Sequence, residues 1–454
     1  MVALKQEETL ILAEKALDNA QKRGADEAEV YTYQGLTTNV VIERGQIAKS
    51  SRIIDRGLGV RAIIDKSVGF AYTNILDNQA AIDETVLRAL NSARASRPDE
   101  DWQGLPIKTD FPSVKGTYDQ KIVELNSEDL VKTAKIMLES AEKTDKRVFP
   151  IEGGAGSSHL CKAVANTNGI GAYEEGTIVE CSLATIAKEG DEVTPVCFEF
   201  EIERTLDINP EWVGKEAARL SASALKAKKT KTESTSIIFT QFALQQLLNY
   251  TLINAVNAEY VQRDQSAFKD KIGANVASQI LTIHDDGLLE GGIRTWRFDD
   301  EGVPQQKTTL IKEGVLRNFL YDNYTARRDK RASTGNASRA GYTSTPNIGA
   351  TNFHITPGGS SPEELVETAE EGIIVYLLGG AHSSDPVSGE FSVVATPAWK
   401  IEKGEITHAV KGAMLAGSVF PLLKNISGLA KNERKIGQLV APWVLAENIK
   451  VVGK

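Results

Sequence analysis

The chain has 454 residues, of which 41% are apolar and 25% charged, and its formal net charge is −9 at pH 7. These values are typical of a globular protein with two or three domains, and the negative charge gives no support for a nucleic-acid-binding surface. No apolar run is long enough to cross a bilayer, and the first residues, MVALKQEETL, lack the apolar core of a signal peptide. We therefore expect neither a membrane nor a nucleic acid as a partner.

The number and spacing of the cysteines indicate the redox state of the protein's compartment. Cys161, Cys181 and Cys197 lie in apolar, strand-like contexts. Their number and spacing allow neither a disulfide framework nor a Cys-x-x-Cys metal site. Buried free thiols in a reducing compartment fit this pattern, so we expect a cytoplasmic protein.

Residues 1–230 are predicted to form an N-terminal α+β domain in which a helix, a β-meander and a helix occur twice. The first unit has helices at 4–22 and about 79–95, with Asn78 as the N-cap of the later one. In the second unit Ser127 is predicted to cap one helix, and the closing helix begins at Pro210, a position that proline favours. Strand-like segments lie between these helices, at 28–34, 37–44, 46–54, 57–64 and 68–73 in the first unit and at about 148–152, 158–167, 170–187 and 192–203 in the second.

Residues 231–454 are predicted to form a mostly antiparallel β domain wrapped around one central helix. We expect that helix at 241–261, where Leu244, Leu247 and Leu248 begin an apolar stripe with three- and four-residue spacing. Nothing in the sequence requires a break in it. Strand and turn patterns make up most of the remaining residues.

Five motifs occur in the order in which the TldD/PmbA family carries them, and the chain resembles this family over nearly its whole length. The resemblance is most specific in the second domain. The motifs are GLGVR with GFA (57–61 and 69–71), FDDEGVP (298–304), IKEGV (311–315), STGNA (333–337) and GEFS (389–392).

In the TldD branch of this family, the central helix carries a zinc-binding His-Glu-x-x-x-His. Counted back from residues 266–268, the three ligand-motif positions hold Asn249, Tyr250 and Asn254 in this chain. A hydrolytic zinc site needs imidazole, thiolate or carboxylate ligands, whereas an amide oxygen binds zinc weakly and a phenol stays protonated near neutral pH. The resemblance also implies a cysteine ligand near the C-terminus, but no cysteine follows Cys197. We expect no zinc, no other cofactor and no catalytic residue in this chain.

The resemblance is therefore to the TldE (PmbA) branch, which lacks the zinc-binding motif and pairs with a zinc-bearing TldD-like subunit. It implies a heterodimeric metallopeptidase that acts on unfolded or leader peptides, with zinc in the partner and a peptide-binding surface in this chain. Extended peptides pair with sheet edges, and glycines allow a second backbone to approach closely. The same glycines could equally serve turns. The candidate peptide-binding residues are Gly335, Asn336, Gly379, Gly380 and Gly389.

Two alternatives stay open. The chain could be a non-proteolytic, homodimeric peptide-binding scaffold of the same fold, and a neighbouring gene for a relative with the intact motif would favour the peptidase subunit instead. It could also be an independent hydrolase that uses Ser383 with His382 and Asp385, or the acidic residues at 285–286 and 299–301. Adjacent loop residues seldom converge as a triad, and carboxylates near turns usually cap them. The other histidines, including His159, are expected to be structural.

Overall fold

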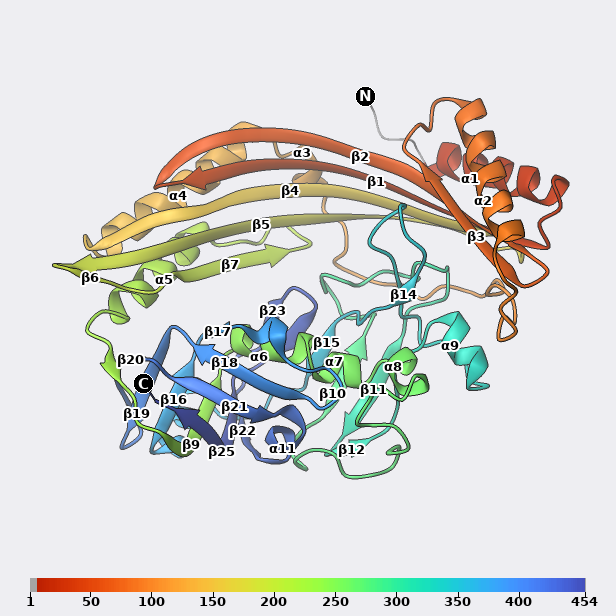
Figure 1. Ribbon diagram of the computed structural model, residues 1–454. Helices are drawn as coiled ribbons and strands as arrows, with labels where there is room; N and C mark the ends of the chain where they lie inside the picture. The colour runs from red at the N-terminus through yellow and green to blue at the C-terminus, as the bar shows by residue number, and fades with distance from the viewer. Residues whose placement is uncertain (1–5, 454) are drawn as a thin grey trace.

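The computed structural model describes residues 6–453. A seven-stranded antiparallel sheet, which we call the long sheet, arches across the molecule (Figure 1). Its strand order is β3-β2-β1-β4-β5-β6, with β7 also paired to β5. The strands are β1 (Glu27–Glu43), β2 (Gln46–Ile64), β3 (Ser67–Thr73), β4 (Val148–Asn166), β5 (Gly171–Glu189), β6 (Glu192–Val193) and β7 (Cys197–Glu203).

Three of the long strands each replace two strands that the sequence predicted, so that part of the prediction was wrong. In β1 and β2 the pairing continues through the expected interruptions, with Gly35 opposite Asp55 and Leu36 opposite Ile54. β4 pairs with β1 along the same stretch. Because β1 finds hydrogen-bond partners on both sides, local glycine and polar residues do not end the strand.

Helices pack on one face of the long sheet, at its two ends. α1 (Gln6–Lys22) and α2 (Gln79–Ala95) lie at one end, and α4 (Ser127–Thr144) and α5 (Pro210–Ser223) lie at the other (Figure 1). The short α3 (Gln120–Glu124) contacts β4 and β5 between them. The predicted N-cap Asn78 is confirmed, since its side chain accepts a hydrogen bond from the Ala80 backbone N–H. The predicted cap Ser127 was wrong, because Asn126 caps α4 by accepting from the backbone N–H groups of Glu128 and Asp129. The two predicted units of helix, β-meander and helix therefore share one sheet, with a pair of helices at each end.

The C-terminal part lies against the opposite face of the long sheet and contains three further sheets. Their pairing is mostly antiparallel, as predicted, with parallel pairs at β9–β16, β15–β24 and β20–β8. The strand orders are β17-β18-β21-β25-β9-β16-β19-β20-β8 with β22 on β25, β12-β11-β10-β15-β24-β23, and β13-β14.

The strands of this part are β8 (Lys228–Lys229), β9 (Glu233–Phe239), β10 (Ile283–Asp286), β11 (Lys307–Lys312), β12 (Val315–Leu316), β13 (Ala337–Ser338), β14 (Asn347–Ile348), β15 (Phe353–Ile355), β16 (Gly372–Val375), β17 (Leu378–Gly379), β18 (Glu390–Ala395), β19 (Ala398–Glu402), β20 (Glu405–Lys411), β21 (Met414–Ser418), β22 (Ile426–Leu429), β23 (Arg434–Ile436), β24 (Leu439–Ala441) and β25 (Val444–Val452). Its peripheral helices are α9 (Asn323–Arg328), η1 (Ala381–Ser383), α10 (Pro362–Ala369) and α11 (Val419–Lys424).

The central helix is broken into three pieces, which corrects the prediction of one continuous helix. The pieces are α6 (Gln241–Asn249), α7 (Leu252–Ala255) and α8 (Ala258–Gln262). At the first break, Thr251 leaves the helical conformation and its hydroxyl donates to the Leu247 carbonyl at 2.7 Å. At the second, the backbone pairs with Leu320, which donates to the Val256 carbonyl and accepts from Ala258 N–H. These contacts satisfy backbone groups that a continuous helix would satisfy itself.

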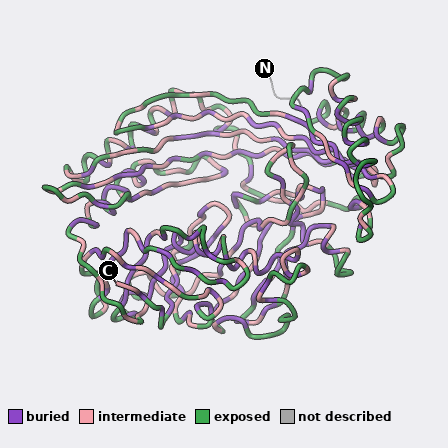
Figure 2. The backbone as a smooth tube through the Cα atoms, in the orientation of Figure 1, coloured by how far each residue is buried: buried purple, intermediate pink, exposed green. Residues whose placement is uncertain are grey.

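The apolar stripe of the central helix is buried as predicted. Leu244, Leu247 and Leu248 belong to the largest core cluster, together with residues from both larger C-terminal sheets. Figure 2 shows many buried residues in this part and along the long strands next to α1 and α2. Within residues 6–453, no helix combines the length and apolar character that a bilayer crossing needs.

Candidate functional site

A cleft of about 720 Å³ lies between the long sheet and the C-terminal part. The long sheet contributes one wall through the face that carries no helices. The C-terminal part contributes the other, which includes the end of α6 and the segments around β13 and β14. The side chains and backbone that line it include Tyr31, Tyr33, Asp55, Leu160, Lys162, Ile178, Ile202, Gln245, Asn249, Ile293, Arg294, Trp296, Asp300, Asn336, Ser338, Arg339, Gly341, Gly349, Thr351, Gly437 and Gln438.

The sheet wall combines apolar side chains with the positively charged side chain of Lys162. The Lys162 ammonium donates to the Phe298 carbonyl at 3.0 Å and to Asp300 Oδ1 at 2.9 Å. It also lies 4.9 Å from the centroid of the Trp296 ring. These three partners neutralise and orient the charge at the border between the two walls.

Asn249 and Asn336, two residues singled out from the sequence, both line this cleft. Asn249 Oδ1 accepts a hydrogen bond from Gln438 Nε2 at 2.9 Å. Asn336 Nδ2 donates to Asp285 at 2.6 Å and to the Gly349 carbonyl at 3.0 Å, so its amide is held by the C-terminal part itself. Because Asn336 is bonded in this way, it shapes the cleft wall through fixed hydrogen bonds.

The candidate glycines lie apart from one another. Gly335 adjoins Asn336, and its φ of +72° with the Pro304 carbonyl 2.5 Å from an added Cβ position makes glycine the residue that fits. Gly379 and Gly380 lie at the end of β17 and the start of η1, and Gly389 precedes β18; none of these three lines the cleft. An added Cβ at Gly389 would meet Phe420 and Val419 at 2.8 Å. Of this set, only Asn336 lines the cleft, and Gly335 is its neighbour in the chain.

The three positions that match the zinc motif do not fit a zinc site. Asn249 ends α6, Tyr250 is the residue that caps it and is 42% exposed, and Asn254 lies beyond the break in α7. They offer two amides and a phenol, and Asn249 is already bonded to Gln438. This donor set lacks the imidazole, thiolate and carboxylate groups that hold catalytic zinc.

Ser383 and Asp385, which the alternative hydrolase would use, form hydrogen bonds with neighbouring backbone groups instead of with each other. The Ser383 hydroxyl donates to the Gly380 carbonyl at 2.7 Å, and Asp385 Oδ1 accepts from the backbone of Val387 and Ser388. Within residues 6–453, no hydrogen bond joins Ser383 to His382 or Asp385. The hydroxyl therefore lacks the neighbouring base that nucleophilic catalysis needs.

The acidic clusters cap turns and form ion pairs. Asp299 accepts from the backbone N–H groups of Glu301, Val303 and Ala337, and Asp300 pairs with Lys162. Asp285 and Asp286 are also bonded within the protein, to Asn336 and Thr351 and to Lys307. These groups support the C-terminal wall of the cleft, which is the turn-capping role considered from the sequence.

Buried ion pairs fix one wall against the other. Arg61 of β2 donates to Glu29 of β1 and to Glu301 of the C-terminal part, and all three side chains are buried. Arg339 also pairs with Glu29, and Arg434 pairs with Glu199 of β7. Sequence analysis predicted none of these ion pairs, because each pair joins segments far apart in the chain. It also gave no indication of Lys162 or Gln438.

The three cysteines are free and buried, as predicted. Burial raises the pKa of the Cys161 thiol to about 11 and that of the Cys181 and Cys197 thiols to about 12. All three thiols are therefore protonated at neutral pH in the metal-free chain, which makes them poor nucleophiles.

Family models cover most of the chain. The PmbA/TldA metallopeptidase domain 1 matches residues 28–93, the central domain matches 120–225, and the C-terminal domain matches 232–453. The chain belongs to the PmbA/TldD family.

Individual relatives agree with this assignment. An uncharacterized protein of Methanocaldococcus jannaschii is 30% identical over 95% of this chain and 98% of its own length. A metalloprotease TldD homologue of Haemophilus influenzae is 29% identical over 92% of this chain and 89% of its own length. The crystal structure of TldE from Thermococcus kodakarensis has a TM-score of 0.91 and 29% identity, and covers 97% of this chain and 100% of that one. The mixed α+β fold is thus that of a TldE structure.

Proposed function

We propose that this chain is a TldE-like subunit of a cytoplasmic zinc metallopeptidase, in which a TldD-like partner holds the zinc. In this proposal the chain contributes peptide-binding surface and stability to the heterodimer and has no catalytic zinc of its own. The observation that carries the proposal is the set Asn249, Tyr250 and Asn254 at the ligand-motif positions, on a helix that breaks among them. The buried free thiols support a reducing compartment.

The cleft supports a peptide as the substrate class. It is formed by a sheet face and by short backbone segments that include Gly341, Gly349 and Gly437. Apolar side chains such as Leu160 and Ile178 alternate there with polar groups, a pattern that accepts an extended chain of varied sequence. An unfolded or leader peptide has such a chain, whereas a folded protein presents few free backbone groups.

The open edge of β2 supports a protein partner. β3 pairs only with residues 58–64 of β2, and within residues 6–453 no strand covers the outer edge of β2 from 46 to 57. Ile53 and Ile54 on this stretch are 53% and 48% exposed. A long edge with exposed apolar side chains is a place where a strand of another chain can pair. We assign this edge to the interface with the partner.

The test is co-expression with a relative that carries the intact His-Glu-x-x-x-His, followed by size-exclusion chromatography. We expect a stable heteromer, and we expect the double change Ile53→Lys and Ile54→Lys to weaken it at least tenfold. Ile406→Lys is the matched control, because Ile406 is 52% exposed on β20 of the C-terminal part. The melting temperature of each variant, measured alone, establishes that the chain is folded.

Two results would contradict the proposal. A failure to associate, together with a stable homodimer of this chain, would favour the homodimeric peptide-binding scaffold. Equal loss of association for the edge variant and the control would place the interface away from β2.

A further inference from the structure

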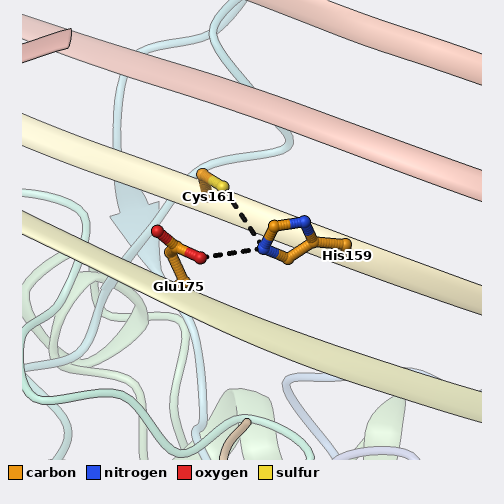
Figure 3. Close-up of side chains that lie close together, drawn as sticks. All are labelled: His159, Cys161 and Glu175. Atoms are coloured by element: carbon orange, nitrogen blue, oxygen red, sulfur yellow. Dashed lines mark hydrogen bonds and ion pairs between the residues drawn. The ribbon is translucent and has the colours of Figure 1, made fainter. Parts of the chain in front are cut away.

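The side chains of His159, Cys161 and Glu175 lie close together on the long sheet (Figure 3). Leu10 of α1 packs against a cluster that includes Cys161, so this is the helix-bearing face of the sheet. His159 and Cys161 are two residues apart on β4, so both side chains point to the same face. Glu175 lies on β5 directly opposite Cys161. Their ligand-capable atoms all fall within 4.8 Å of one another. By strand alternation these side chains lie on the face opposite the one that carries the Lys162 side chain, although Cys161 also borders the cleft.

We propose that these three side chains bind a divalent zinc-type cation that links β4 to β5. The donor set is imidazole, thiolate and carboxylate, the three ligand classes that zinc prefers. The inference concerns a site separate from the family's zinc motif, and it does not depend on the function proposed above. The sequence predicted that the whole chain lacks zinc. With this proposal, that prediction applies only to the central helix.

The spacing of the donor atoms fits tetrahedral coordination. Bonds of about 2.0–2.3 Å to a tetrahedral zinc place neighbouring ligand atoms about 3.3–3.6 Å apart. In the structure, His159 Nε2 lies 3.8 Å from Cys161 Sγ and 2.9 Å from Glu175 Oε2. Shifts of a few tenths of an ångström, which side-chain torsions allow, bring both distances into that range.

The surroundings hold the ligands and leave one side open. Tyr173 Oη donates to Glu175 Oε1 at 2.8 Å, so Oε2 is the carboxylate oxygen directed at His159. The Tyr118 ring packs edge-on against the His159 ring, with 5.9 Å between centroids. Such outer contacts commonly orient metal ligands. The His159 and Glu175 side chains are 17% and 37% exposed, which leaves room for water as a fourth ligand.

Cobalt provides a direct test, because Co²⁺ bound to a thiolate gives a near-ultraviolet charge-transfer absorption. The full-length chain is dialysed against a chelator and titrated with Co²⁺, and then with Zn²⁺ as competitor. We expect about one Co²⁺ per chain, displacement by Zn²⁺, and a higher melting temperature with Zn²⁺. Cys161→Ala should abolish the charge-transfer band, and His159→Gln or Glu175→Gln should weaken binding at least tenfold.

Matched controls separate this site from other cysteines and histidines and from the central helix. Cys181→Ala changes another buried thiol, His408→Gln changes a histidine on β20, and Asn249→Ala changes the family ligand position. All three should bind Co²⁺ as the unchanged chain does. No thiolate band in the unchanged chain, or a band that persists in Cys161→Ala, would overturn the proposal. Circular dichroism establishes that each variant is folded, and Glu175→Gln, at a partly exposed position, gives an independent result if Cys161→Ala unfolds.

Discussion

Arg61 and Glu301 join the long sheet to the C-terminal part through a buried hydrogen bond of 2.7 Å. The same guanidinium nitrogen lies 2.8 Å from Glu29 on the neighbouring strand. Burial disfavours the charge on Arg61, but the two carboxylates more than offset this effect and hold its pKa above the ordinary value. Both walls of the cleft are therefore positioned by one charged group and its partners.

Loss of the Glu301 charge should destabilise the fold. We expect Glu301→Gln to lower the free energy of unfolding by about 3 kcal/mol, because it leaves part of a buried charge uncompensated. Urea denaturation measures this change. The control is Glu100→Gln, whose partner Lys66 is 48% exposed, and it should change stability by less than about 1 kcal/mol. Equal effects of the two variants would show that the Arg61 contact contributes little.

The centre of the apolar stripe on α6 gives a second prediction. Leu248 is 2% exposed, so Leu248→Asp places an unpaired charge in the main core. We expect a loss of at least about 3 kcal/mol and a clear fall in melting temperature. Ile280→Asp, at a residue that is 49% exposed, is the control and should melt near the unchanged chain. An unchanged melting temperature for Leu248→Asp would mean that this face of α6 does not pack as described.

Asp285 gives a prediction about pH. Burial raises its pKa from 3.8 to about 6, although hydrogen bonds from Asn336 and Thr351 act in the opposite direction. The folded chain thus binds a proton more tightly than the unfolded chain does. Its contribution to stability is fully present below about pH 4 and is lost as the pH rises through about 6.

Asp285→Asn removes this titration and isolates its effect. The stability of the unchanged chain relative to the variant should be greater at pH 4.5 than at pH 7, by an amount on the order of 2 kcal/mol. Denaturation at the two pH values measures it. Asp207→Asn, at an exposed residue, should show no such difference. A relative stability that rises with pH would contradict the assignment of a raised pKa to Asp285.

Local patterns predicted the starts of helices well. Asn78 caps α2, and Pro210 occupies the first position of α5, because caps and first-turn preferences act within a few residues. Strand length was predicted poorly. Pairing between distant segments carries β1 and β2 through positions that look like interruptions in the sequence, such as Gly35 opposite Asp55.

The cleft could not be predicted, since its walls come together only in the fold. Tyr33 lies on β1 and Asn249 ends α6, and nothing in either local sequence indicates the other. The second break in the central helix, between α7 and α8, likewise depends on the distant segment that contains Leu320. The His159 group carried a usable signal: a turn at Asn168 with Gly169 favours a β4–β5 hairpin, and Cys161 and Glu175 stand at equal distance from Asn168.

Peptide cleavage tests the central claim, that this chain needs a zinc-bearing partner, most directly. The measurement is the rate at which an unfolded peptide is cleaved by this chain alone, by the relative with the intact motif alone, and by their equimolar mixture, before and after chelation. We predict no cleavage by this chain alone and cleavage by the mixture that chelation abolishes. Cleavage by this chain alone that resists chelation and is lost in Ser383→Ala would contradict the account and favour the independent hydrolase.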